Sequence, residues 1–205
     1  MKKILFVMVL TLASVNVLAQ SRSTKRETNR RGTSKRTEVS EDRKGHGAVT
    51  MELEFQYVMI GGDEKDLFKD FNCGMATAMG YRYYLHNNFF VEGLFGYRWY
   101  SLWMVNDAST TVHNLTLPIH IGGYIDVSDK FALRPFFGPR VDIPVASKVE
   151  YKGKSQSADV DPGVTLEFGL DFQFNDTWGL RAKYGLGVGG YKNQNYASLG
   201  FTVGI

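Results

Sequence analysis

Two histidines are the residues with the clearest catalytic potential in this sequence. A histidine that contacts a serine or a cysteine can activate it as a nucleophile when a third group orients the ring. His113 and His120 occur without a His-x-Ser pair or a GxSxG sequence, and no acidic residue is evidently placed to orient either ring. We therefore predict no catalytic residue, and we interpret His120 as a polar group that forms hydrogen bonds inside the fold.

A glycine-rich stretch at residues 185–190 (GLGVGG) formally matches the GxGxxG sequence of dinucleotide-binding folds. In those folds a helix follows the glycines and holds the pyrophosphate at its N-terminus. No helical pattern follows here, so we interpret the glycines as small residues on one face of a strand. The sequence shows no metal-site spacing of His, Cys and Asp. Its single cysteine, Cys73, excludes a CxxC motif and an internal disulfide. We predict neither a cofactor nor a metal.

Charged residues form the third group, because twelve of them recur at alternate positions among small and polar residues. Six are basic and six are acidic, so their formal charges sum to zero. Such residues can line a conducting path, or they can pair with one another and close it. We predict a structural network of ion pairs in the interior of a barrel, with a conducting path as the alternative. The twelve residues are Glu52, Glu54, Arg82, Glu92, Arg98, Arg134, Arg140, Asp142, Glu167, Asp171, Arg181 and Lys183.

The elements that carry these charges repeat with a period of two. In the clearest segment Leu166, Phe168 and Leu170 alternate with Glu167 and Asp171. This is the period of a strand with two unlike faces, and no window shows an apolar face at helical spacing. We predict an all-β fold with eight antiparallel strands. The alternating segments are residues 51–59, 71–85, 89–99, 114–122, 131–143, 164–174, 178–189 and 197–205.

The same alternation fits a soluble lipocalin-type barrel with an apolar interior and a membrane barrel with an apolar exterior. Glycine weakens a water-facing strand, whereas in a narrow lumen small residues relieve crowding. Short connections near residues 86–88, 126–130 and 175–177 alternate with generally longer ones, of which 145–162 is much the longest. This pattern is typical of transmembrane barrels. We therefore predict that the apolar face contacts lipid.

Aromatic residues cluster near the ends of the segments, as the two interfacial girdles of a membrane barrel require. We expect the following residues to lie in or near these girdles: Tyr83, Tyr84, Phe89, Phe90, Phe172, Phe174 and Trp178 at one level, and Tyr57, Phe71, Trp99, Tyr100, Trp103 and Tyr196 at the other.

Two further segments precede the strands. Residues 1–19 begin with Lys2 and Lys3, continue through a short apolar run and end at Val17-Leu18-Ala19, which predicts a signal peptide rather than a membrane anchor. Residues 20–48 contain nine Lys/Arg, four Asp/Glu and almost no large apolar side chain, so we expect a disordered basic segment. Export excludes a nucleic-acid role for it. It can contact a periplasmic protein, the cell wall or lipid phosphates, or act only as a spacer.

The stretch Leu133-Arg134-Pro135-Phe136-Phe137-Gly138, the terminal residues 196–205 and the glycine-rich alternating strands resemble the eight-stranded OmpA/OmpX-type outer-membrane barrels. Residues 49–205 are most similar to the PorT-like outer membrane protein beta-barrel domain of Bacteroidota. The resemblance implies a Gram-negative outer-membrane protein with both termini in the periplasm. The chain departs from this family in ending Phe201-Thr202-Val203-Gly204-Ile205 without a terminal aromatic residue. Prolines within the segments, at Pro118, Pro135 and Pro139, predict bulges or local breaks in the fourth and fifth strands.

We thus expect a transmembrane barrel that contacts outer-membrane lipid, is closed to bulk solute and has no enzymatic activity. Its role would be envelope integrity, or contact with an extracellular partner through residues 145–162. The PorT resemblance implies an alternative, an accessory barrel of a secretion system that recruits a periplasmic partner through residues 20–48. A lipid-modifying barrel enzyme is a third class, and it requires a Ser–His pair that the sequence does not show.

Overall fold

The computed structural model describes residues 43–204, apart from 129, 175–176 and 191–193. The predicted signal peptide and most of the predicted basic segment lie outside the described residues. Within them the chain forms ten strands and one 3₁₀ helix. The elements are β1 (Gly47–Ile60), η2 (Gly62–Leu67), β2 (Asn72–His86), β3 (Phe89–Trp103), β4 (Ser109–Gly123), β5 (Ile125–Ser128), β6 (Phe131–Tyr151), β7 (Lys154–Ser157), β8 (Gly163–Gln173), β9 (Trp178–Gly189) and β10 (Gln194–Gly204).

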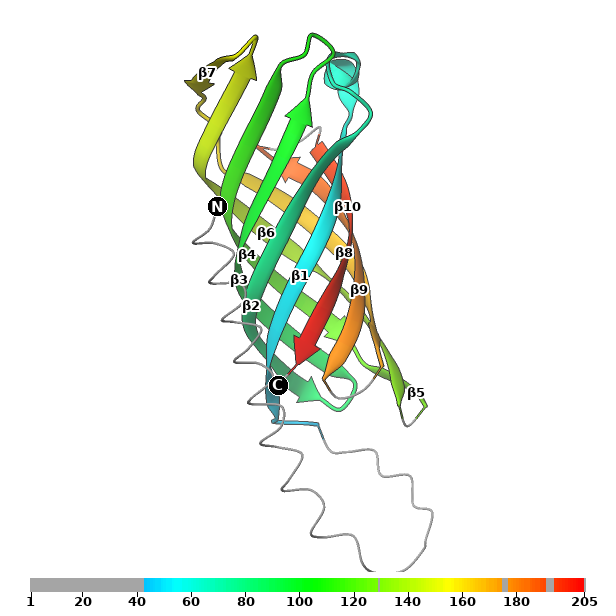
Figure 1. The fold of residues 1–205 in the computed structure, drawn as a ribbon. Coiled ribbons are helices and arrows are strands. Elements are labelled where there is room, and N and C mark those ends of the chain that lie inside the picture. The colour runs from blue at the N-terminus through cyan, green and yellow to red at the C-terminus, as the bar shows by residue number, and fades with distance from the viewer. Residues whose placement is uncertain (1–42, 129, 175–176, 191–193, 205) are drawn as a thin grey trace, which may run out of the picture. The chain divides into compact units, whose positions relative to one another are not determined.

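Eight of these strands close into an antiparallel barrel (Figure 1). Their order is β4-β3-β2-β1-β10-β9-β8-β6, and the pairing of β4 with β6 completes the ring. Thr50 near the start of β1 pairs with Gly204 at the end of β10. The first strand therefore starts, and the last strand finishes, at the same end of the barrel. Closure gives every strand two neighbours and leaves no edge within the ring. The predicted eight-stranded fold is confirmed.

The two remaining strands extend the barrel at opposite ends (Figure 1). β5 pairs with the start of β6. β7 pairs with the end of β6 through a tight turn at Lys152 and Gly153, both of which have positive φ. Much of residues 145–162, which we expected to be a loop, is therefore a β-hairpin. The sequence does not reveal this hairpin because its second arm, β7, is polar on both faces and so has no apolar alternation.

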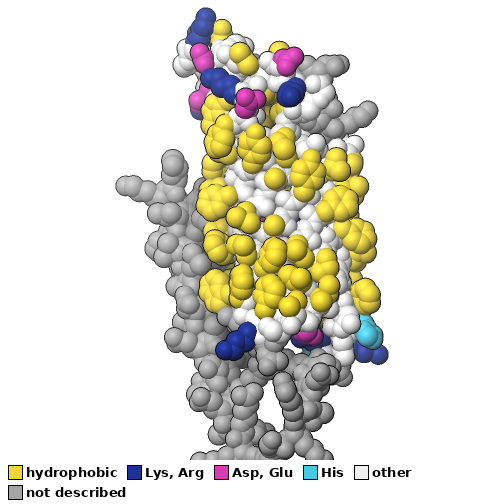
Figure 2. Space-filling model, turned by 90° about the vertical axis from the view of Figure 1, so that its right-hand side faces the viewer, with side chains coloured by type: hydrophobic (Ala, Val, Ile, Leu, Met, Phe, Trp, Pro, Cys, Tyr) yellow, Lys and Arg dark blue, Asp and Glu magenta, His cyan; other side chains and the backbone are white. Residues whose placement is uncertain are grey.

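The strand faces alternate as the sequence predicts. On β8, Phe168 is 47% exposed whereas Glu167 is fully buried. Figure 2 shows the result on one side of the barrel: a broad belt of hydrophobic side chains, with charged side chains gathered above and below it. A polar interior with an apolar exterior is the arrangement of a membrane barrel and the inverse of a lipocalin-type barrel. No helix in the described residues is long and apolar enough to cross a membrane.

Several aromatic residues that we expected in the girdles lie inside the barrel instead. Phe90, Tyr100 and Tyr196 are at most 2% exposed, and Tyr84 contacts Phe90 at a ring-centroid distance of 6.2 Å. On their strands each of these residues shares the parity of the buried charged or polar residues, not of the outward apolar ones. Parity decides the face of a strand residue, whereas proximity to a strand end does not.

Local breaks lie opposite two of the prolines. The β3–β4 pairing is interrupted at Pro118, and the β4–β6 pairing is interrupted at Pro139. On the side of β8 the ladder is intact. Pro135 and Pro139 pair with Leu170 and Leu166 in one unbroken register. The shift in the β4–β6 pairing falls after Pro144, where Val145 is the extra residue. This bulge lies near the end of β6 that forms the hairpin, and further register shifts occur between Tyr84 and His86 on β2 and between Val164 and Thr165 on β8.

The N-terminal boundary of the fold lies earlier than expected. β1 begins at Gly47, and residues 43–46, assigned by sequence to the basic segment, contact one end of the barrel. Arg43 forms a two-bond ion pair with Asp126 at 3.0 and 2.9 Å and lies over the ring of Tyr124. The backbone N–H of Gly45 donates to the carbonyl of Tyr84.

Candidate functional site

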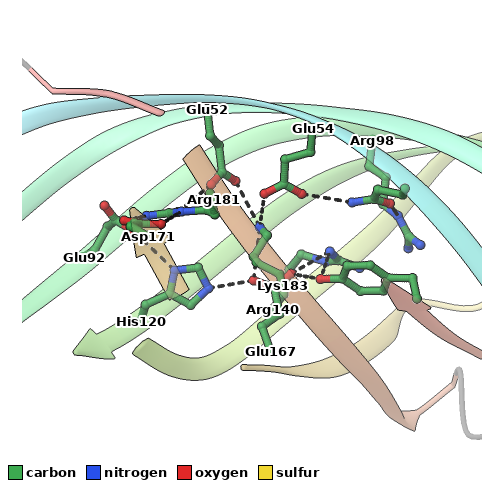
Figure 3. Close-up of polar contacts among 12 residues, drawn as sticks. Glu52, Glu54, Glu92, Arg98, His120, Arg140, Glu167, Asp171, Arg181 and Lys183 are labelled. Carbon is green, nitrogen blue, oxygen red and sulfur yellow. Dashed lines mark hydrogen bonds and ion pairs between the residues drawn. The ribbon is translucent and has the colours of Figure 1, made fainter. Parts of the chain in front are cut away.

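The candidate site is the charged interior of the barrel (Figure 3). The structure places all twelve charged residues there, none more than 5% exposed. They project inward from β1, β2, β3, β6, β8 and β9, because each occupies an inward position in the two-residue repeat. β4 and β10 contribute His120 and Tyr196 to the same interior.

Arg181 on β9 connects three acidic residues from three strands. Its guanidinium contacts Glu52 at 2.5 Å, Asp171 at 2.5 Å and Glu92 at 3.0 Å. Arg82 on β2 reaches two of the same carboxylates, Glu92 at 2.5 Å and Asp171 at 3.3 Å. Planar guanidinium groups suit such shared contacts because their five donors point in fixed directions.

Lys183, two residues along β9, forms the next layer. Its ammonium contacts Glu54, Glu52 at 3.4 Å and Glu167 at 3.6 Å. Glu52 contacts both Arg181 and Lys183, so it joins the two layers. A compact ammonium with rotatable donors can bond carboxylates in several directions at once.

Two arginines form a third layer toward the β7 end. Arg140 contacts Asp142 at 2.8 Å and Glu167 at 2.7 Å, and it donates to the hydroxyl of Tyr196 at 2.6 Å. Arg98 contacts Asp142 at 3.0 Å and donates to Gln56 at 2.6 Å. The guanidinium groups also lie over the ring of Tyr196, with that of Arg98 at 5.0 Å and that of Arg140 at 4.5 Å from its centre. The tyrosine is thus held by cation–π contacts as well as by hydrogen bonds.

Arg134 is the least tightly held member of the network. Its guanidinium lies 3.4 Å from Asp171, and its Nε has no hydrogen-bond partner among the described residues. Asp171 is already shared with Arg181 and Arg82. A buried guanidinium with so few acceptors contributes little net stabilisation, because its desolvation is poorly offset.

Apolar layers lie on both sides of the charges. Toward the β7 end, Val58, Tyr100, Val112 and Tyr196 pack together, and Val160 packs on them. At the other end, the ring of Phe90 lies 4.7 Å from the guanidinium of Arg82. Phe90 packs against Tyr84, which contacts Tyr124. The interior therefore has an apolar cap at each end and charges between them.

Sequence reasoning missed two polar members of the network. Tyr196 bonds Arg140 and Glu167, and Gln56 bonds Arg98 and Glu54. Parity with the neighbouring inward residues was the signal for Tyr196, because Ser198 and Thr202 on the same strand are also buried. Gln56 has the same parity as Glu54 on β1, but it is uncharged and so is not among the twelve residues of the charge pattern.

The chemistry of this interior is that of ion pairing. Within the described residues no group of three or more His, Cys, Asp or Glu is arranged to hold a metal ion. Buried ion pairs give little net stability, but removing one partner leaves the other charge unpaired in a low-dielectric interior. Such a network therefore holds the strands in one arrangement.

Comparisons with known proteins agree with this architecture. The sequence matches the family model described as "Outer membrane protein beta-barrel domain" over residues 7–205. Neisserial surface protein A has 12% identity and a TM-score of 0.50, covering 77% of this chain and 96% of its own. The attachment invasion locus protein Ail of Yersinia pestis has 15% identity and a TM-score of 0.47, covering 79% and 99%. The N-terminal barrel domain of Pseudomonas aeruginosa OprF has 13% identity and a TM-score of 0.47, covering 79% and 100%.

A search of curated proteins found no match. The family match spans nearly the whole sequence and every strand of the barrel. The chain therefore belongs to the outer membrane protein beta-barrel domain family.

Proposed function

We propose that this protein is a closed, non-enzymatic outer-membrane barrel that displays the β6–β7 hairpin at the cell surface. The observation that carries the proposal is the filled interior, in which paired charges lie between apolar caps. An eight-stranded barrel is just wide enough for its side chains to fill it. The rigid ring of strands then holds in place the segments that extend beyond the membrane.

We infer the orientation of the barrel from the elements at its two ends. The chain enters and leaves at the β5 end, which we assign to the periplasm, and β7 then lies outside the cell. The outer hairpin borders a cavity of about 250 Å³ lined with polar side chains. Its lining includes Asp107, Glu150, Lys152 and Lys154. This mixed-charge surface is suited to polar contacts with an extracellular partner.

Planar-bilayer recordings test whether the interior is closed. The purified protein, shown to be folded by heat-modifiable migration on gels, is expected to give no steady openings. Steady conductance would contradict the closed interior. An epitope inserted in the Lys152-Gly153 turn is expected to be detected on whole cells, whereas one added after Ile205 is expected to require permeabilised cells. The reverse labelling would contradict the orientation.

A secretion-accessory role is the second candidate, and the contacts of Arg43 favour it. Arg43, which directly follows the basic residues 20–42 in the sequence, is paired with Asp126 on the exposed β5 strand. A periplasmic partner that bound both residues 20–42 and β5 would be held against the barrel. Deletion of residues 20–42, which keeps Arg43, is expected to abolish secretion in this case. Unchanged secretion would reduce the segment to a spacer.

A further inference from the structure

His120 lies at the centre of the charged interior, between two carboxylates. Its Nε2 is 2.6 Å from Oε2 of Glu167 on β8, and its Nδ1 is 3.4 Å from Oε2 of Glu92 on β3. The imidazole is fully buried, and the ring of Phe136 packs against it at a centroid distance of 4.7 Å. Both ring nitrogens therefore face carboxylate oxygens.

Hydrogen-bond accounting shows the consequence. A neutral imidazole has one N–H donor and one nitrogen that can only accept, whereas an ionised carboxylate can only accept. If His120 were neutral and both glutamates ionised, one of the two contacts would join two acceptors. That contact would be buried where water does not compensate it, which is unfavourable.

We propose that Glu92, His120 and Glu167 form a proton-binding site that holds one proton more than a neutral imidazole and two carboxylates. The proton completes both contacts whether His120 is doubly protonated or a glutamate carries it. Neighbouring carboxylates share such a proton, and the site titrates as a unit.

The cations around the site oppose an added proton, so the two hydrogen bonds that the proton completes must offset them. Arg181 also contacts Glu92, and Lys183 and Arg140 also contact Glu167. Since the twelve charged residues sum to zero, the proton gives the interior a net charge of +1. The charged and titratable groups that surround the triad are Glu52 and Glu54 on β1, Arg82 on β2, Arg140 on β6, Asp171 on β8, Arg181 and Lys183 on β9 and Tyr196 on β10.

The chain provides internal controls for a direct test. It has four histidines, and His46, His86 and His113 lie outside the interior network. Nitrogen NMR of ¹⁵N-histidine-labelled protein in lipid nanodiscs distinguishes protonated from bare ring nitrogens. Single variants His46→Gln, His86→Gln and His113→Gln assign those signals and leave His120 by elimination, without a change in the barrel interior.

A pH titration from about 5 to about 9 spans the ordinary pKa of histidine, about 6.5. His120 is expected to show two protonated nitrogens throughout. One protonated nitrogen accompanied by a carboxylic-acid infrared band that disappears in Glu92→Gln or Glu167→Gln would also support the site. One protonated nitrogen at neutral pH without such a band would overturn it.

Discussion

The hydroxyl of Tyr196 donates to Glu167 and accepts a 2.6 Å hydrogen bond from Arg140. One phenol on β10 thereby joins a carboxylate on β8 to a guanidinium on β6. β6 and β10 are not neighbours in the ring, so this contact crosses the lumen. The interior side chains therefore bind opposite walls of the barrel together, in addition to the ladder bonds that join neighbouring strands.

Removal of this hydroxyl tests the cross-lumen contact. Tyr196→Phe removes one donor from Glu167 and one acceptor from Arg140, and we expect a loss of about 1–3 kcal/mol in the free energy of unfolding. The measurement is urea unfolding of the barrel in lipid vesicles. Tyr184→Phe on β9 is the matched control, because Tyr184 is 41% exposed on the outer face. Equal effects of the two substitutions would contradict a special role for Tyr196.

We expect the removal of different charged residues from the network to destabilise the barrel to different extents. Arg181→Met leaves Glu52, Glu92 and Asp171 short of a partner, and loss of a partner from buried ion pairs costs about 3–5 kcal/mol. Arg134→Met removes a residue with one long contact and is expected to be nearly neutral or slightly stabilising. Unfolding midpoints of both variants under one set of conditions provide the comparison. A larger loss from Arg134→Met would mean that its contacts matter more than their geometry indicates.

Close packing inside the barrel predicts a position-specific effect of added methyl groups. A Cβ on Gly185 would lie 2.0 Å from the ring of Tyr196, whereas one on Gly93, on the outer face, would meet no atom within 4 Å. Gly185→Ala is therefore expected to lower the unfolding midpoint by the equivalent of about 1–3 kcal/mol. Gly93→Ala is expected to be neutral or stabilising, since alanine lowers the entropy of the unfolded chain. Tolerance of Gly185→Ala would show that Tyr196 can move.

The alternation in the sequence predicted which side chains face the interior of the barrel, but not which of them contact one another. Alternation on β8 separates Glu167 from Phe168 without any knowledge of the neighbouring strands, because side-chain direction depends only on parity. It cannot show that Arg181 meets Glu52, because that contact depends on the stagger of the strands around the ring. Tyr100 and Tyr196 were placed wrongly because an aromatic ring near a strand end suits a girdle as well as an interior cap. The β6–β7 hairpin was missed because it lies beyond the apolar belt.

The apolar belt predicts a dependence on depth in the membrane. Phe168 lies in the middle of β8 and is 47% exposed, and Phe174 lies just beyond the end of that strand and is 54% exposed. Phe168→Arg is expected to cost about 2–4 kcal/mol, as arginine does near the midplane of a bilayer, and Phe174→Arg about 0–1 kcal/mol. Folding into vesicles, followed by heat-modifiable migration, measures both. In a water-facing sheet the two substitutions would be equally mild, so equal effects would contradict a lipid-facing exterior.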